Sequence, residues 1–180
     1  MKPVAIGVAG RIGSGKTTLA RALAGKLQCP RASFGDYVLS VAVERGLDVT
    51  NRASLQELGD RLIARGWIEF CTAVLEHAHY TGGSVVVDGV RHPAAADTLA
   101  AIVRPVPWRL IALNIDSALR SRRLAERGID PAAAMRMDAH PNESQVSAVF
   151  ATADFTITGG ASADQAAEIA YQWIDREFGA

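Results

Sequence analysis

Residues 10–17 read Gly-Arg-Ile-Gly-Ser-Gly-Lys-Thr and complete the pattern GxxxxGK[ST]. The apolar run PVAIGVA at residues 3–9 comes directly before them, and leucines recur every four residues after them, at Leu19, Leu23 and Leu27. A short apolar run that stops at glycine is typical of a strand buried on both faces of a parallel sheet. A four-residue repeat of leucine is typical of one stripe of a helix. The sequence therefore predicts a strand, a glycine-rich loop and a helix in succession.

The residue types in this loop suit a bound phosphate. Glycines let the backbone wrap closely around a phosphate, so that successive N–H groups converge on its oxygens. The helix that starts near Gly15 directs its positive end at the same anion. Lys16 can reach the β- and γ-phosphates, and the Thr17 hydroxyl can ligate Mg²⁺. A glycine-rich turn with a surface lysine is the alternative, but the strand and helix around the loop favour a site for a nucleoside triphosphate. The loop residues expected to contact ATP are Gly10, Arg11, Ile12, Gly13, Ser14, Gly15, Lys16, Thr17 and Thr18.

Apolar strands and amphipathic helices alternate along the rest of the chain. We expect further strands at residues 31–34, 84–88, 109–115 and 154–158, and helices near 36–46, 55–65, 67–80, 93–103, 116–128 and 162–178. Ser54-Leu-Gln-Glu57 fits a capping box at the start of one helix. This alternation predicts an α/β protein with a single domain over residues 1–180. The expected architecture is a three-layer P-loop NTPase fold with a five-stranded parallel sheet and a small helical lid at about 116–140.

The composition argues against several classes of protein. The chain has 180 residues, 19 Lys and Arg balance 19 Asp and Glu, and 49% of the residues are hydrophobic. Such a neutral balance is unusual for a protein that binds nucleic acid. No apolar run approaches the ~18–20 residues that span a bilayer, and the first residues lack the pattern of a signal peptide. Cys29 and Cys71 have no CxxC spacing that would indicate a metal site. We expect a cytoplasmic monomer or homodimer that binds neither nucleic acid nor membrane, and whose partner is a small-molecule phosphate acceptor.

Other motifs narrow the class of P-loop protein. A regulatory GTPase would carry NKxD and a transporter ATPase would carry LSGGQ, and the sequence contains neither. A RecA-like or AAA motor usually needs a longer chain. A small kinase is the class that remains.

The chain resembles the P-loop nucleotide kinases, that is, the adenylate-kinase-like nucleoside monophosphate kinases and their close relative dephospho-CoA kinase. Residues 9–17, AGRIGSGKT, are similar to the GGIGSGKS form of dephospho-CoA kinase. Residues 33–36, SFGD, resemble the segment that carries a substrate-facing acid after the second strand. Residues 87–91, VDGVR, resemble the strand-end DGxxR of monophosphate kinases, and residues 153–157, ADFTI, resemble the ADYxI strand near the end of the family. These matches span nearly the whole chain.

This resemblance implies a phosphotransferase that uses ATP and Mg²⁺. The first acceptor it implies is a nucleoside or deoxynucleoside monophosphate. Dephospho-CoA, which accepts on a ribose hydroxyl, is the alternative among enzymes, and a nucleotide-dependent regulatory or binding P-loop ATPase is the alternative of another class. Three positions depart from the family: Leu39 replaces a frequent arginine, residues 88–91 replace a DVPLL-type segment, and Gly159-Gly160 replace an asparagine near the adenine. These departures leave the acceptor and the donor base open.

Three arginines resemble those of the lid in these kinases, namely Arg120, Arg123 and Arg127. On a helix their spacing of i, i+3 and i+7 places them on one face. Guanidinium groups suit phosphate oxygens, and phosphoryl transfer spreads charge over the oxygens of the moving group. We therefore expect Arg120 to contact ATP, and Arg123 and Arg127 to act on the transferring phosphoryl group. A solvated helix face paired with neighbouring acids is the alternative.

Two acids and two further arginines complete the expected site. Asp88 ends a buried strand, at the edge where open parallel sheets bind ligands, so it can hold Mg²⁺ together with Thr17 or orient the acceptor. Asp36 follows another strand and can orient the attacking group or cap the next helix. Arg91 can grip the acceptor's phosphate, or it can form a surface salt bridge instead. The expected acceptor-binding residues are Asp36, Arg52 and Arg91. The residues expected to act in catalysis are Lys16, Asp36, Asp88, Arg123 and Arg127.

Overall fold

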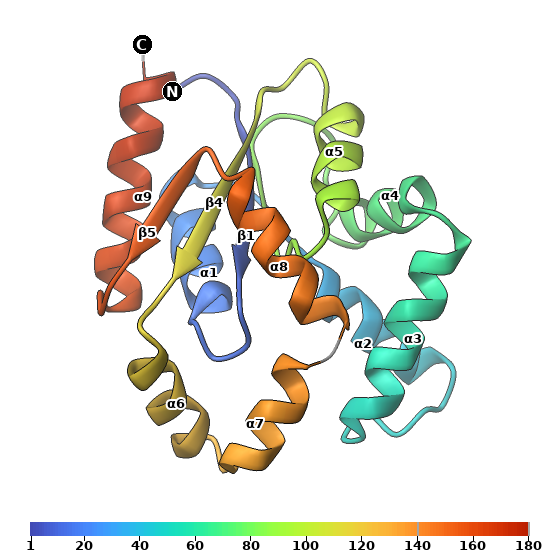
Figure 1. The fold of residues 1–180 in the computed structure, drawn as a ribbon. Helices are drawn as coiled ribbons and strands as arrows, with labels where there is room; N and C mark the ends of the chain where they lie inside the picture. Colours follow the sequence, from blue (N-terminus) through green and yellow to red (C-terminus); the bar gives the residue numbers. More distant parts are fainter. Residues whose placement is uncertain (140, 180) are drawn as a thin grey trace.

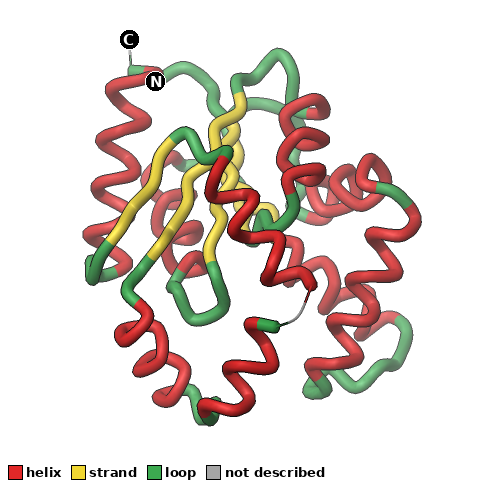
Figure 2. Tube along the Cα trace, in the orientation of Figure 1, coloured by secondary structure: helices red, strands yellow, loops and turns green. Residues whose placement is uncertain are grey.

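One all-parallel sheet with helices on both faces forms the frame of the molecule (Figures 1 and 2). The computed structural model describes residues 1–139 and 141–179, apart from the side chains at positions 52, 137, 138 and 141–144. The strand order is β2-β3-β1-β4-β5. The strands are β1 (Ala5–Gly10), β2 (Arg31–Ser33), β3 (Val85–Asp88), β4 (Trp108–Asn114) and β5 (Phe155–Thr158). The expected five-stranded parallel sheet is therefore confirmed.

Helices cover both faces of the sheet, and two more lie beyond the carboxyl ends of its strands (Figure 1). The helices are α1 (Lys16–Leu27), α2 (Phe34–Glu44), α3 (Arg52–Arg65), α4 (Trp67–His77), α5 (Pro93–Ile102), α6 (Ser117–Glu126), α7 (Pro131–Asp138), α8 (Pro141–Ala151) and α9 (Ala163–Phe178). One buried core lies between the sheet and α1 with α9, and another lies between the sheet and α2, α3, α4, α5 and α8. These are the three layers that the sequence predicts. No helix within the described residues is long and apolar enough to cross a membrane.

The two cores explain why β1 reads as a continuous apolar run. All six of its residues are buried, and alternate side chains enter opposite cores. Ile6 and Val8 pack with α1 and α9, while Ala5 and Ala9 pack on the other face.

Burial also raises the pKa of the Cys71 thiol to about 12, so this residue behaves as a core residue.

Gly7 of β1 lies against an aromatic ring, which leads to a prediction about stability. A Cβ at this position would lie 2.5 Å from Cζ2 of Trp108 and 3.0 Å from Cδ1 of Leu110. Gly7→Ala should therefore lower the free energy of unfolding by about 1–3 kcal/mol, measured by urea titration, because the core would be overpacked. The matched control is Gly25→Ala, where a Cβ meets nothing within 4 Å. Equal stability of the two variants would contradict the prediction.

The start of α3 differs from the prediction. This helix begins at Arg52, and Asn51 is its N-cap, with a side-chain oxygen that accepts hydrogen bonds from the backbone N–H groups of Ala53 and Ser54. The capping box predicted at Ser54 is therefore wrong. Asparagine caps helices as well as serine does, and it stands three residues earlier in the chain.

The alternative role of Asp36 as an N-cap is also wrong. Ser33 caps α2, because its hydroxyl accepts a hydrogen bond from the Asp36 backbone N–H at 3.2 Å. Asp36 lies in the first turn of the helix, where its carboxylate is used for a different contact.

Residues 117–138, where the lid is expected, contain α6 and α7. The sequence predicts one helix in this region, and it does not predict α8, which follows.

Candidate active site

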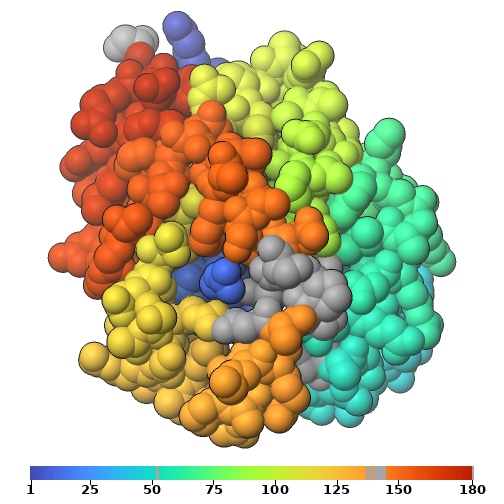
Figure 3. All heavy atoms as spheres, in the orientation of Figure 1, coloured from blue at the N-terminus to red at the C-terminus, as the bar shows by residue number. Residues whose placement is uncertain are grey.

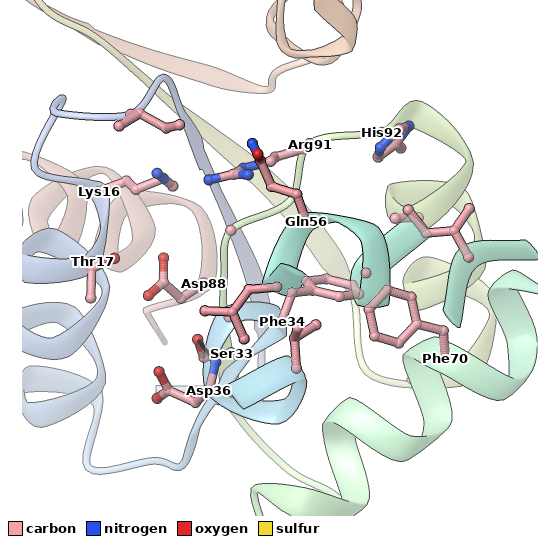
Figure 4. Close-up of a pocket in the computed structure, with 18 of the residues that line it drawn as sticks. Lys16, Thr17, Ser33, Phe34, Asp36, Gln56, Phe70, Asp88, Arg91 and His92 are labelled. Atoms are coloured by element: carbon pink, nitrogen blue, oxygen red, sulfur yellow. Dashed lines mark hydrogen bonds between the residues drawn. The ribbon is translucent and has the colours of Figure 1, made fainter. Parts of the chain in front are cut away.

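The loop between β1 and α1 has the backbone geometry that its glycines permit. Gly13 and Gly15 have φ angles of 82° and 94°, in the left-handed region that other residues rarely adopt. Gly15 is the N-cap of α1, so Lys16 is the first residue of that helix. Only 9% of Lys16 is exposed, and its ammonium group points across a cavity toward Arg91 (Figure 4). The loop and helix start therefore have the backbone geometry expected of a phosphate site.

Helix α6 is packed directly against this loop. Nη1 of Arg123 donates a hydrogen bond to the carbonyl oxygen of Ser14 at 2.7 Å. A Cβ on Gly13 would lie 2.9 Å from Leu124, so the close approach of α6 also requires glycine there. Atoms from the start of the chain are visible at the base of a hollow bordered by α6, α7 and α8 (Figure 3). Arg123 thus holds the loop that would bind the phosphates.

The other two arginines of the expected lid reach different places. Arg127 lines the larger cavity, next to the loop. Arg120 lines a second cavity of about 210 Å³ together with Arg11 and Ser14. The guanidinium group of Arg11 also donates a hydrogen bond to Oγ of Ser147 on α8 at 3.0 Å. The arginine face of α6 therefore surrounds the phosphate loop from two sides.

The larger cavity has a volume of about 540 Å³ and two chemically different walls. Its polar wall includes Lys16, Thr17, Ser33, Asp36, Asp88, Arg91 and Arg127, and its apolar wall includes Phe34, Leu55, Ile63, Trp67 and Phe70. The rings of Phe34 and Phe70 meet edge to face, with centroids 5.1 Å apart. One cavity thus joins the phosphate loop to an aromatic chamber formed by α2, α3 and α4 (Figure 4).

The parallel register brings the two acids to the same edge of the sheet. Ser33 at the end of β2 pairs with Asp88 at the end of β3, and Asp36 follows one helical turn later. Between them lies Arg31, whose Nη1 donates a hydrogen bond to Oδ2 of Asp88 at 3.0 Å and whose Nη2 donates to Oδ2 of Asp36. The side chain of Asp88 is only 4% exposed and that of Arg31 is 16% exposed. One guanidinium group therefore bridges both expected acids.

Arg31 is not among the site residues that the sequence predicts. A signal for it is present, because Arg31 stands two residues before Ser33 in a strand and so projects from the same face of the sheet. The aromatic wall is also missed, since Phe34 belongs to α2 while Trp67 and Phe70 belong to α4, about 30 residues later in the chain.

The Asp88 carboxylate also fits a metal ion. Its Oδ1 is buried and has no hydrogen-bond partner among the described residues, while the Thr17 hydroxyl lies on the same side of the cavity (Figure 4). Within the part of the chain that the structure describes, no three His, Cys, Asp or Glu side chains gather into a protein-only metal site. Mg²⁺ bound to nucleotides needs only one or two protein oxygens, because phosphates and waters complete its shell. Thr17 and Asp88 fit that pattern.

Two expected contacts remain outside this arrangement. Thr18 is exposed on α1 and lines neither cavity. The side chain of Arg52 lies outside the part of the chain that the structure describes.

The ADFTI segment has a structural role, since Oδ2 of Asp154 accepts a hydrogen bond from the Leu110 backbone N–H at 2.7 Å.

Comparisons with known proteins agree with this fold and loop. Residues 6–142 match the family described as "AAA domain". A cytidylate kinase from Pyrobaculum islandicum is 33% identical over 127 residues, which cover 69% of this chain and 60% of that relative. The chain thus spans less than two thirds of the length of this curated relative.

Solved structures match over nearly the whole chain. TT1252 from Thermus thermophilus superposes with a TM-score of 0.66 at 19% identity, and the match covers 100% of both chains. Shikimate kinase from Aquifex aeolicus superposes with a TM-score of 0.58 at 16% identity over 98% of this chain and 100% of that one. Identities this low show the fold alone. The chain belongs to the AAA domain family of P-loop proteins and has the fold of the small P-loop kinases that its sequence resembles.

Proposed function

We propose that this chain is an ATP-dependent phosphotransferase that transfers the γ-phosphoryl group to a nucleoside or deoxynucleoside monophosphate. The observation that carries the proposal is the single cavity that contains both the phosphate loop and a second chamber with its own cation, Arg91. A second substrate needs such a chamber next to the γ-phosphate. The similarity to a cytidylate kinase supports this acceptor class. In this proposal one domain, residues 1–180, binds both substrates.

The cavity gives each polar residue a role in the proposed reaction. Lys16 neutralises charge between the β- and γ-phosphates, and Arg127 faces the oxygens of the moving group. Asp36 orients the acceptor's attacking oxygen. Thr17 and Asp88 would hold Mg²⁺, which would neutralise charge on the phosphates. Because the reacting groups approach inside one cavity, the protein's contribution is mainly positioning and electrostatic stabilisation.

Two alternative functions are each consistent with a specific observation. Dephospho-CoA would present a ribose hydroxyl, which an acid such as Asp36 can orient. A regulatory or binding ATPase would be consistent with the description of the matching family, but it would not need the second chamber. The cytoplasmic location and the monomeric or homodimeric state stay predictions.

A screen of acceptors tests the proposed function directly. ATP consumption would be measured with Mg²⁺ and each of CMP, UMP, AMP, GMP, dCMP and dephospho-CoA, with product identified by mass spectrometry. We expect a nucleoside diphosphate to form from at least one monophosphate. Phosphorylation of dephospho-CoA alone would identify the other acceptor, and ATP hydrolysis that no acceptor stimulates would contradict the proposal.

The position of Arg91 predicts which substrate it binds. Arg91→Ala should raise the acceptor KM about 10–150-fold and leave the ATP KM nearly unchanged, because a charged hydrogen-bond donor to the acceptor's phosphate is lost. Arg91→Lys should recover only part of this loss, since an ammonium group cannot form the two parallel hydrogen bonds. Steady-state kinetics with each substrate varied in turn measure both values.

The control for this prediction is Arg61→Ala on α3. Arg61 is exposed, pairs with Glu57 at 2.7 Å and does not line the cavity, so its loss should change both KM values less than about twofold. A rise in the ATP KM of Arg91→Ala would instead place Arg91 at the donor.

A further inference from the structure

Gly59 lies in the interior of α3, where glycine is a poor helix former. Alanine is the better residue at such a position, because glycine loses more backbone freedom on folding. A glycine is usually retained for a left-handed backbone or for a close packing contact. Gly59 has neither, since its φ lies outside the left-handed region and a Cβ built on it meets no heavy atom within 4 Å. Folding therefore does not explain this glycine.

The location of Gly59 offers another reason. Gly59 lines the 540 Å³ cavity, as do Leu55 one turn before it and Ile63 one turn after it. Leu55 and Ile63 are about 12 Å apart along the helix axis, because each residue adds about 1.5 Å. With no side chain midway, the helix presents a notch between two apolar side chains. Gln56 also lines this cavity, and its amide lies beside Arg91 (Figure 4).

The aromatic residues of the same apolar wall suit a flat group. Phe34 and Phe70 both point into the chamber, and Trp67 lies beside Phe70 with ring centroids 6.3 Å apart. Aromatic rings and flat apolar surfaces favour a planar ligand that stacks or packs edge-on. A nucleobase has apolar faces and a polar edge, which suits a cavity that combines aromatic side chains with polar ones.

We propose that Gly59 is a specificity-determining position, at which the missing side chain leaves room for the acceptor's planar base against the backbone of α3. This inference rests on the proposed function, because it needs a second substrate in the chamber. It assigns the base to the notch between Leu55 and Ile63, and leaves the acceptor's phosphate to the polar wall. The glycine lowers helix stability, and in this proposal it provides the space that the base occupies.

The test compares Gly59→Ala and Gly59→Leu with Gly25→Ala. Gly25 is also a helical glycine whose Cβ would meet nothing within 4 Å, but it lies near the far end of α1 and lines neither cavity. We expect Gly59→Ala and Gly25→Ala both to raise the Tm, because alanine favours a helix. With CMP and AMP as acceptors, Gly59→Ala should raise the acceptor KM at least about fivefold and Gly59→Leu more, since each crowds the base. The ATP KM should change less than about twofold, and Gly25→Ala should leave both KM values unchanged.

Three results would overturn the inference. If Gly59→Ala keeps the wild-type KM for an acceptor that the wild type phosphorylates, the notch does not hold the base and only the role of Gly59 fails. If Gly59→Ala lowers the Tm, the glycine serves folding. If the wild type neither phosphorylates nor binds CMP or AMP in calorimetric titration, the proposed monophosphate acceptor fails together with the notch.

Discussion

Replacement of Lys16 by alanine should lower kcat by about 10²–10³-fold while the fold is retained. The ammonium group lies at the first residue of α1, where it would face the charge that builds between the β- and γ-phosphates. Alanine is a good helix former, so α1 should begin at the same place. The measurement is kcat at saturating ATP and acceptor, with circular dichroism to follow the fold.

Lys26→Ala is the matched control for this substitution. Lys26 lies on the same helix, but it is exposed and pairs with Glu168 on α9 at 2.7 Å. Exposed ion pairs contribute little, so kcat should stay within about twofold. Full activity of Lys16→Ala together with normal ATP binding would exclude the loop as the site of phosphoryl transfer.

The second large effect is expected at Asp88. Asp88→Asn keeps the shape of the side chain and an oxygen that can accept a hydrogen bond from Arg31, but it removes the negative charge. We expect kcat at low Mg²⁺ to fall by about 10²-fold or more, because the carboxylate proposed to hold a cation at the transferring phosphate is lost. The measurement is kcat as a function of Mg²⁺ concentration, and part of the loss should be recovered at high Mg²⁺.

Asp164→Asn provides the control, since Asp164 is exposed in the first turn of α9 and lines neither cavity. This variant should keep the wild-type Mg²⁺ dependence. If Asp88→Asn also kept it, with only stability reduced, the acid would serve the ion pair with Arg31 alone. Buried ion pairs can be lost at a stability cost without any effect on chemistry, so both quantities must be measured.

The fold could be predicted from local patterns because each pattern reports on burial. The apolar runs at β1, β3 and β4 locate the centre of the sheet, and the loop at residues 10–17 locates the candidate phosphate site. Helix starts were less predictable, because Asn51 and Ser54 are both good N-caps and the sequence alone does not choose between them. The sequence signal at residues 131–151 is weak, since α7 and α8 have few buried positions among their described residues.

The candidate site was predictable where a motif fixes the chemistry, and unpredictable where distant residues meet. Lys16 and Thr17 follow from the motif, and Asp88 follows from its place at the end of a strand. Arg31 gains its importance only when β2 pairs with β3 and brings its guanidinium group to Asp88. From the sequence alone Gly59 is only a poor helix former within a helix, and its place beside the cavity becomes apparent only in the structure.

The central position of β1 has a consequence for synthesis on the ribosome. This strand is formed early, but its two neighbours, β3 and β4, begin at Val85 and Trp108. At about 5–20 residues per second, the wait from Gly10 to the start of β3 lasts roughly 4–15 s. During that interval a fully apolar strand, AIGVAG, has neither neighbour with which to pair. Helix α1, which follows directly in the chain and packs on β1 in the folded protein, is the first element available to cover one side of the strand before the sheet closes around it.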